Sequence, residues 1–497
     1  MTTAHAQSKR DARGLSLNFL GIVAQVALPA FHVQLARFLG AGGYGLYTWS
    51  SAFVDVFSVV TLFGCDQAVM RQVSLTHQTD RRAAAIVVGS ALRVVLLSGC
   101  VVVVAMFFGA PVVGAFQHKA GLVAPLRCLA LVPLFYHVAT VFLVATQACG
   151  VMRWAFWARA IAQPLVLLLT TSVALRVGWG APGAALAVAV GMAVTAALAC
   201  LFYARELPLG PTLRAIVVGS VNRDMLRVAV PLVLANLLWA LVGRIDAFFL
   251  GHYGNEGELG AYAACALYAA GISQVRGAFE PVTSALVAPA LTRGDAKSLS
   301  VAIQRQTRWL AYVVFPMAAV LIGFGDPLLR LFGHGFTQGV PALCVLAVGH
   351  TANALALASF VLPLSGNARY TTWVAAFTLV LQGTLSMILV PRFGLLGAAI
   401  ALSAGLVSAQ TAQMILAARI ARVWGLSRNL IAVLACAGFG IAMGRIVYHA
   451  IDASLVLRFA LGITASAITY AISGWAFALT PEDRTLAVGA VRWLRVL

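Results

Sequence analysis

The chain has 497 residues, of which 61% are hydrophobic and only 10% are charged, and its mean hydropathy is +0.93. Because soluble domains have about 25% charged and 45–50% apolar residues, this composition excludes an ordinary soluble protein. The net charge of +19 is spread over many short segments rather than gathered in one patch, which argues against binding of nucleic acid. It fits the loops of a multi-pass membrane protein, with anionic membrane lipids as partners.

Apolar segments of about 20 residues, the length with which a helix crosses a bilayer, recur along the whole chain. We expect an all-α fold with about fourteen transmembrane helices. Most Lys and Arg residues then lie on one side, which predicts that the N- and C-termini are cytoplasmic. Short turns at Gly180 and Gly394 separate two closely spaced pairs. The expected spans are 14–38, 46–69, 84–108, 122–146, 155–177, 182–203, 228–250, 260–288, 308–331, 341–363, 370–390, 395–418, 429–449 and 454–478.

A polar stripe runs along the second expected span. Thr48, Ser51, Asp55 and Ser58 follow one another at intervals of 3, 4 and 3 residues, which places them on one face of a helix. In a membrane protein such a face lines water or pairs with a neighbouring helix, because exposure to lipid is costly. The stripe therefore predicts a polar path beside this span.

A second stripe lies in the first expected span. Asn18, Gln25 and His32 recur every seven residues, and Pro29 among them is expected to kink the helix. The alternative is that these three side chains only form hydrogen bonds to neighbouring helices. A proton-sensing role of His32 is a further alternative.

The sequence also repeats itself at offsets of 216 and 214 positions. Six expected spans lie in each copy, so the copies share one orientation. We therefore expect two six-helix lobes, 1–215 and 216–424, related by a pseudo-two-fold axis along the membrane normal, while 425–497 holds two further spans and a cytoplasmic tail. The matched residues are Gly150, Arg153 and Trp157 with Gly366, Arg369 and Trp373; Gly180, Gly183, Ala184, Ala185 and Ala187 with Gly394, Gly397, Ala398, Ala399 and Ala401; and Leu39, Gly40, Gly45 and Tyr47 with Leu250, Gly251, Gly260 and Tyr262.

Three stretches carry a resemblance to a known family. Residues 39–47 (LGAGGYGLY) resemble the LGxxxYGxY signature of bacterial polysaccharide flippases. Asp246, shortly before Leu250 and Gly251, is similar to the seventh span of that family, and residues 393–399 (FGLLGAA) resemble its junction between spans 11 and 12. The chain thus resembles the Wzx-type polysaccharide transporters of the multidrug/oligosaccharidyl-lipid/polysaccharide (MOP) exporter superfamily.

The resemblance implies a function and a place for the site. It implies that the chain moves undecaprenyl-pyrophosphate-linked oligosaccharide across the bacterial inner membrane by alternating access, for surface polysaccharides such as O-antigen or exopolysaccharide. Spans 1, 2, 7 and 8 border the central cavity in that family. The polymerase machinery that receives the glycan would be a further partner.

The cavity should hold the cations that a pyrophosphate needs, and arginine suits phosphate through its planar, permanently charged fork. Arg244 and Arg276, about 9 Å and 24 Å from the outer ends of their expected spans, would form two stations for the anion. Alternatively, Arg276 and Glu280 neutralise each other, since they are four residues apart on a helix, whereas Arg244 and Asp246 are two apart and do not face each other. The substrate-binding candidates are Arg244, Arg276, Asn18, Gln25, His32, Ser51, Asn236 and Gln274, and the acids that could couple transport to H⁺ or Na⁺ are Asp55, Asp246 and Glu280.

Other classes fit the sequence less well. A peptidoglycan lipid II flippase is the nearest alternative, although its basic residues in the first span have no clear match here. An ion-coupled drug or cation antiporter should have a carboxylate in span 1, and none lies between Asp11 and Asp55. We expect no enzyme activity, cofactor or metal site, because the sequence has no nucleophile set, phosphate-binding loop or metal-ligand cluster, and its eight cysteines are scattered singly.

Overall fold

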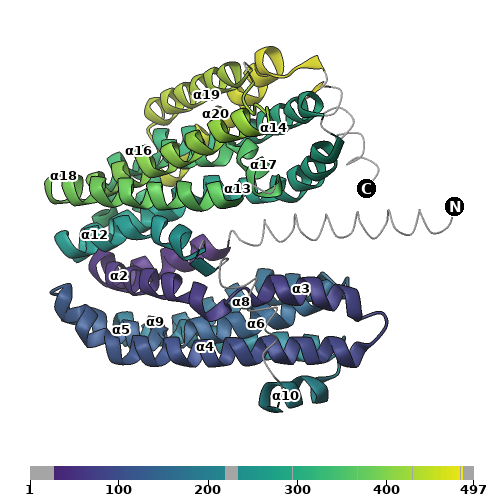
Figure 1. Ribbon diagram of the computed structural model, residues 1–497. Helices are drawn as coiled ribbons and strands as arrows, with labels where there is room; N and C mark the ends of the chain where they lie inside the picture. Colours follow the sequence, from purple (N-terminus) through teal and green to yellow (C-terminus); the bar gives the residue numbers. More distant parts are fainter. Residues whose placement is uncertain are drawn as a thin grey trace. The chain divides into compact units, whose positions relative to one another are not determined.

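The computed structural model of the chain describes residues 27–218, 233–234, 236–293, 295–365, 368–427, 429–481 and 483–484. All regular elements in these ranges are helices, as the sequence predicts. The chain divides into two compact units, Met1–Gly260 and Ala261–Leu497 (Figure 1). The lobes expected at 1–215, 216–424 and 425–497 stay a prediction.

Unit 1 is a bundle whose apolar core lies between α4, α6 and α9, with Leu92, Phe142 and Tyr203 among its buried residues. Its first long helix bends at Gly40, where φ is 68° and ψ is 179°, a backbone conformation that glycine adopts without steric cost. His32 and Tyr44 form a 3.1 Å hydrogen bond from the two sides of this bend. The helices are α2 (Ala27–Leu62), α3 (Cys65–Thr76), α4 (Arg81–Phe116), η1 (Ala120–Leu122), α5 (Val123–Leu129), α6 (Val132–Ala148), α7 (Arg153–Ala155), η2 (Phe156–Ala162), α8 (Gln163–Arg176), α9 (Gly180–Tyr203), α10 (Leu209–Val218), α12 (Ile245–Tyr253) and the first residues of α13 (Glu256–Arg293).

Unit 2 contains the rest of α13 and the helices that follow it. Its longest helix, α18, bends at Gly394, where φ is 53° and ψ is −129°, three residues after Pro391. The positive φ values of Gly180 and Gly394 confirm turns at both of the expected positions. The helices are α14 (Ala296–Gly323), α15 (Gly325–Arg330), η3 (His334–Gly339), α16 (Val340–Leu355), η4 (Leu357–Phe360), α17 (Val361–Leu364), α18 (Ala368–Ile420), α19 (Leu430–Ala450), α20 (Leu455–Ser473) and η5 (Gly474–Ala478).

Nine helices among the described residues are long and apolar enough to cross a membrane. One of them, Arg369–Ile420, contains the two expected spans 370–390 and 395–418, and another, Pro29–Thr76, contains the span 46–69 and the end of the span 14–38. The expected spans 228–250, 260–288 and 341–363 are not among the nine. The first lies partly outside the described residues, the second is the charged helix α13, and the third is interrupted after α16. The count of fourteen therefore stays a prediction.

Apolar side chains are exposed on several long helices, as expected where a helix meets lipid. On α4, for example, Val101, Val104 and Phe108 have exposed side chains. The expected kink at Pro29 lies at the edge of the described residues and is not tested there.

Candidate functional site

Two oppositely charged side chains meet in unit 1. Asp55 lies on α2, and Arg244 is the residue immediately before α12. A guanidinium nitrogen of Arg244 donates a hydrogen bond to a carboxylate oxygen of Asp55. The two side chains are 44% and 48% exposed, so the pair borders open space rather than the packed core. Because α12 has nine residues, Arg244 lies about 14 Å from the far end of this helix.

The other members of the stripe on α2 have different partners. The hydroxyls of Thr48 and Ser51 donate to carbonyls four residues earlier in the same helix, over 2.9 and 3.1 Å. Ser58 instead forms a 2.6 Å hydrogen bond with His137 of α6. Within the stripe, the side chain of Asp55 is therefore half exposed, whereas that of Ser58 contacts α6.

The remaining candidates of unit 1 are less well defined. Asn18 and Gln25 lie outside the described residues. His32 is half-buried against Tyr44, and Asn236 is exposed. Asp246 is buried in the first turn of α12, where a carboxylate is favoured by the helix dipole.

A lysine that was not among the predicted site residues binds the C-terminal end of α12. The ammonium group of Lys119, in the connection between α4 and η1, donates to the carbonyls of Gly251 and Gly254, each over 2.7 Å. The same group lies 5.1 Å from the ring of Trp49 on α2. Lys119 thus caps the carbonyl end of α12 and links it to two other elements of unit 1. A single lysine between two apolar spans is the only sequence signal for this role.

The start of α13 lies directly against α2 at this end of unit 1. A Cβ atom on Gly45 would be 2.1 Å from the carbonyl oxygen of Glu256, and one on Gly260 would be 2.1 Å from that of Ala41. No side chain fits between these backbones. Gly45 and Gly260 are also matched residues of the sequence repeat, so both copies of the motif lie at one helix crossing.

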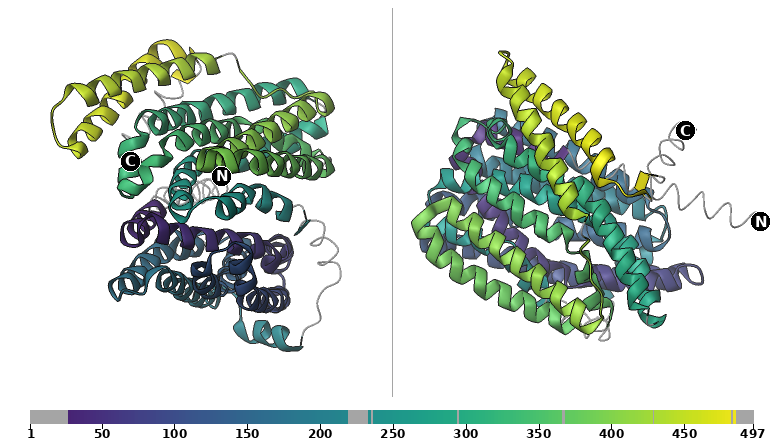
Figure 2. Two further views of the ribbon diagram at one scale, coloured as in Figure 1. Left: turned by 90° about the vertical axis from the view of Figure 1, so that its left-hand side faces the viewer. Right: turned by 90° about the horizontal axis from the view of Figure 1, so that it is seen from above.

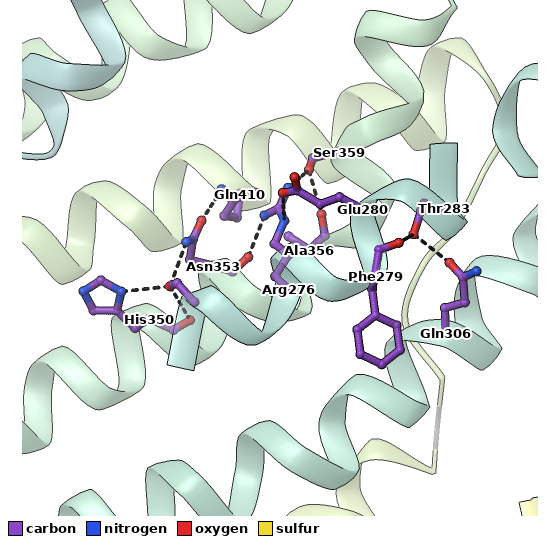
Figure 3. A network of polar contacts seen from close by, with 11 residues as sticks. Arg276, Phe279, Glu280, Thr283, Gln306, His350, Asn353, Ala356, Ser359 and Gln410 are labelled. Carbon is purple, nitrogen blue, oxygen red and sulfur yellow. Dashed lines mark hydrogen bonds and ion pairs between the residues drawn. The ribbon is translucent and has the colours of Figure 1, made fainter. Parts of the chain in front are cut away.

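Arg276 of α13 lies in unit 2 and is the centre of a polar network (Figure 3). Its guanidinium donates to the carbonyl of Asn353 over 2.7 Å and to the hydroxyl of Ser359 over 2.8 Å. Its carbon Cζ lies 4.6 Å from the ring of Phe360, and its Nε lies 3.7 Å from Glu280. Arg276 is 9% exposed, so most of its hydrogen-bonding capacity is used inside the protein.

The network explains the interruption of the tenth expected span. Asn353 is in the last turn of α16, where carbonyls lack helical partners, and η4 begins two residues after α16 ends. Arg276 bonds to both sides of this break. The side chain of Asn353 donates to Ser273 over 2.9 Å and accepts from Gln410 over 2.7 Å. Asn353 and Gln410 were missed as candidates, although they are polar residues inside expected spans.

The last two candidates flank Arg276 on α13. Gln274 is exposed, and the side chain of Glu280 is 46% exposed. The contact between Arg276 and Glu280 is the helical pair that the spacing allows. Arg276 therefore combines a weak ion pair with strong contacts to backbone and hydroxyl groups, whereas Arg244 has one carboxylate partner and an open side.

A polytopic helical bundle with charged pairs inside its spanning region is typical of membrane transporters. Solved structures of such transporters are similar to this one. An inward-facing MATE family transporter of the MOP superfamily has a TM-score of 0.66 and 17% identity, over 80% of this chain and 94% of its own. The lipid II flippase MurJ in an inward closed conformation has a TM-score of 0.68 and 13% identity, over 93% and 99%. A MOP superfamily transporter from Pyrococcus furiosus has a TM-score of 0.60 and 18% identity, over 82% and 95%.

These similarities show that the chain has the fold of the MOP superfamily transporters. The family follows from the sequence itself. A family described as polysaccharide biosynthesis protein matches residues 34–341, and the chain belongs to it. The expected resemblance is thereby confirmed. No curated protein sequence matches the chain.

Proposed function

We propose that this protein moves undecaprenyl-pyrophosphate-linked oligosaccharides across the bacterial inner membrane for the synthesis of a surface polysaccharide. Both termini are cytoplasmic in this proposal, the protein acts as a transporter rather than an enzyme, and the polymerase machinery receives the glycan. Support comes from membership of a polysaccharide biosynthesis family and from the fold of the MOP transporters. The single structural observation that carries the proposal is the half-exposed ion pair of Arg244 and Asp55.

Arg244 has the properties of a host for a phosphate group. Its guanidinium has five N–H donors in a fixed fork, 44% of its side chain is exposed, and among the residues that the structure describes its carboxylate partner is Asp55. It also stands at the N-terminus of α12, where the unpaired backbone N–H groups favour an anion. A pyrophosphate therefore meets a cation and a helix dipole at the same point.

The binding step is an exchange of partners. Pyrophosphate carries more negative charge than one carboxylate and offers oxygens for bidentate contact, so it displaces Asp55 from Arg244. The released carboxylate then lies beside the substrate without its cation. Asp55 is for this reason the proposed coupling group for H⁺ or Na⁺, with Asp246 and Glu280 as the other acids of the pathway.

Arg276 has a different task in this proposal. Because its donors hold the break between α16 and η4, Arg276 fixes the shape of the pathway in unit 2, and the exposed Gln274 and Glu280 beside it contact the glycan. Ser51, His32 and Asn236 provide polar contacts in unit 1, and Asn18 and Gln25 extend the polar face of the first span.

Transport of labelled undecaprenyl-pyrophosphate oligosaccharide into liposomes tests the proposal directly. The purified protein should move this lipid, and Arg244→Gln should reduce the rate about 10- to 100-fold, the value of a lost hydrogen bond to a charged group. Arg330→Gln is the matched control, because Arg330 and Asp326 form an ion pair with nearly the same exposed fractions, 41% and 45%. Equal rates for both variants would contradict the role of Arg244.

Complementation distinguishes the substrates. Both lipid-linked oligosaccharides and lipid II carry a pyrophosphate, so Arg244 alone does not separate them. Rescue of surface polysaccharide in a host that lacks its O-antigen flippase supports the proposed substrate. Rescue of growth in a host depleted of its lipid II flippase, without rescue of surface polysaccharide, assigns the protein to peptidoglycan synthesis.

A further inference from the structure

A cluster of basic and aromatic side chains lies at one end of unit 1, away from Arg244. The indole ring of Trp154 in α7 is flanked by two guanidinium groups, with Cζ of Arg153 at 4.4 Å and Cζ of Arg205 at 5.1 Å from the ring centre. Phe202, near the end of α9, stacks on the same indole at 4.7 Å between ring centres. We call Arg153, Trp154, Arg205 and Glu206 the Trp154 cluster.

The charges of this cluster do not balance. Glu206 accepts a 2.7 Å hydrogen bond from the indole nitrogen of Trp154 and lies 3.8 Å from Arg153. Arg153 and Arg205 are exposed, and the side chain of Arg153 is 60% exposed. Two guanidinium groups thus stand against one carboxylate in this cluster.

The depth of the cluster follows from the length of α9. A helix of 24 residues is about 36 Å long, whereas the hydrocarbon core of a bilayer is about 30 Å thick. Arg205 and Glu206 follow shortly after Tyr203, the last residue of α9, so they lie at the headgroup layer. Tryptophan and arginine are the residues that favour this layer.

The short helix α10 follows the cluster in the chain and carries an apolar face. It packs on the first part of α4, where the carbonyl oxygen of Thr212 comes so close to Gly89 that a Cβ there would be 2.3 Å away (Figures 1 and 2). On its other side, Leu213, Val217 and Val218 are 57%, 76% and 84% exposed. Leu213 and Val217 lie on one face of α10, with the exposed Arg214 and Val218 beside them, which is the pattern of a helix that lies in the membrane interface.

We propose that the Trp154 cluster binds the phosphodiester headgroup of an anionic phospholipid, while the exposed face of α10 lies among the acyl chains of the same leaflet. The guanidinium groups of Arg153 and Arg205 both lie against the ring of Trp154, and these contacts orient them for bidentate binding of phosphate oxygens. The excess of positive charge selects a lipid with net negative charge over a zwitterionic one. The site is independent of which glycan the protein transports.

Native mass spectrometry of the full chain in detergent tests this site. Titration with dioleoyl phosphatidylglycerol and dioleoyl phosphatidylcholine gives the affinity for each lipid. The double variant Arg153→Gln/Arg205→Gln should lose affinity for phosphatidylglycerol by about 30-fold, because two basic residues at the surface are removed. The matched control is Arg305→Gln/Arg369→Gln, which removes two exposed arginines that each lie over a single ring, of Trp309 and Tyr370.

A second variant keeps the test valid if the arginine variant does not fold. Leu213→Ser/Val217→Ser changes only exposed side chains, and it should weaken binding of both lipids. Equal affinity of the wild type for the two lipids, or equal loss in the cluster variant and the control, overturns the proposal. Displacement of phosphatidylglycerol by a tenfold lower concentration of undecaprenyl pyrophosphate would also overturn it, because the cluster would then bind the transported lipid.

Discussion

Gly45 and Gly260, which are matched residues of the sequence repeat, pack backbone to backbone where α2 crosses the start of α13. A Cβ atom on either residue would lie 2.1 Å from a carbonyl oxygen of the other helix, and carbonyl oxygens do not move without the helix that carries them. Gly45 of the LGAGGYGLY motif and Gly260 of its counterpart therefore act by allowing two helices to approach closely, as small residues do between membrane helices.

This crossing predicts the effect of adding one methyl group. Gly45→Ala should destabilise the protein by about 1–3 kcal/mol or more, because overpacking here forces two backbones apart. Thermal unfolding in detergent measures the effect, and transport should fall in parallel. Gly109→Ala is the control, since nothing lies within 4 Å of a Cβ at that position of α4. Equal stability of both variants would show that the crossing is loose.

The sequence located this crossing only in part. The repeat showed that Gly45 and Gly260 are equivalent, but a pattern of spacings does not say that equivalent residues touch. The bend at Gly394 was predicted correctly, because this glycine lies between two closely spaced apolar segments, each long enough to cross a membrane. The ends of the long helices were less predictable. The tenth span, for example, is broken after α16 by contacts with Arg276, which lies 77 residues away from Asn353.

The cap on α12 provides a second prediction. Lys119→Met removes two hydrogen bonds to the carbonyls of Gly251 and Gly254. Each carbonyl that stays buried without a donor then lowers the stability of the fold by about 1–3 kcal/mol. Backbone amide exchange in residues 245–254 should therefore accelerate by at least about tenfold. Hydrogen exchange followed by mass spectrometry measures this peptide. Lys119→Arg retains donors and should stay close to the wild type, and fast exchange in that variant as well would argue against a capping role.

The end of the described chain offers a prediction about pH. Asp483 accepts hydrogen bonds from Arg308, Trp309 and Tyr312 of α14, over 3.0, 2.8 and 3.0 Å. Burial by itself raises the pKa of Asp483, but the hydrogen bonds from Arg308, Thr480, Trp309 and Tyr312 outweigh burial and hold the pKa well below its usual range. The folded protein therefore binds a proton at Asp483 less readily than the unfolded chain does.

It follows that the carboxylate of Asp483 contributes its full stabilisation above the ordinary aspartate pKa of about 4. This contribution decreases as the pH falls from there towards the lower pKa that Asp483 has in the folded protein. Asp483→Asn should cost about 3 kcal/mol at neutral pH, since it leaves the charge of Arg308 buried and unpaired. The difference in stability between wild type and variant should be constant from about pH 8 to 5 and shrink below about pH 4. Asp326→Asn, in an exposed pair, should cost less than about 1 kcal/mol.

The two arginines that the sequence singled out should behave differently when they are replaced. Both are cations within expected spans, and the spacing of the sequence gives only Arg276 a partner on its own helix, Glu280. The larger difference lies in their other partners, which the sequence does not show. Arg276 bonds to a helix end and a hydroxyl and is 9% exposed, whereas Arg244 bonds to one carboxylate and is open to the surroundings. The first arrangement stabilises structure, and the second leaves donors for a ligand.

Arg276→Met should therefore lower the stability of the protein by about 2–4 kcal/mol, because the carbonyl of Asn353 and the hydroxyl of Ser359 lose a charged donor. Arg244→Gln should change stability by less than about 1 kcal/mol, since its ion pair is half exposed, and should act on transport instead. Thermal unfolding and liposome transport, measured on both variants, give the comparison. If Arg276→Met has wild-type stability but does not transport, Arg276 binds the substrate directly. A loss of stability in Arg244→Gln equal to that in Arg276→Met would instead make the pair with Asp55 a structural contact.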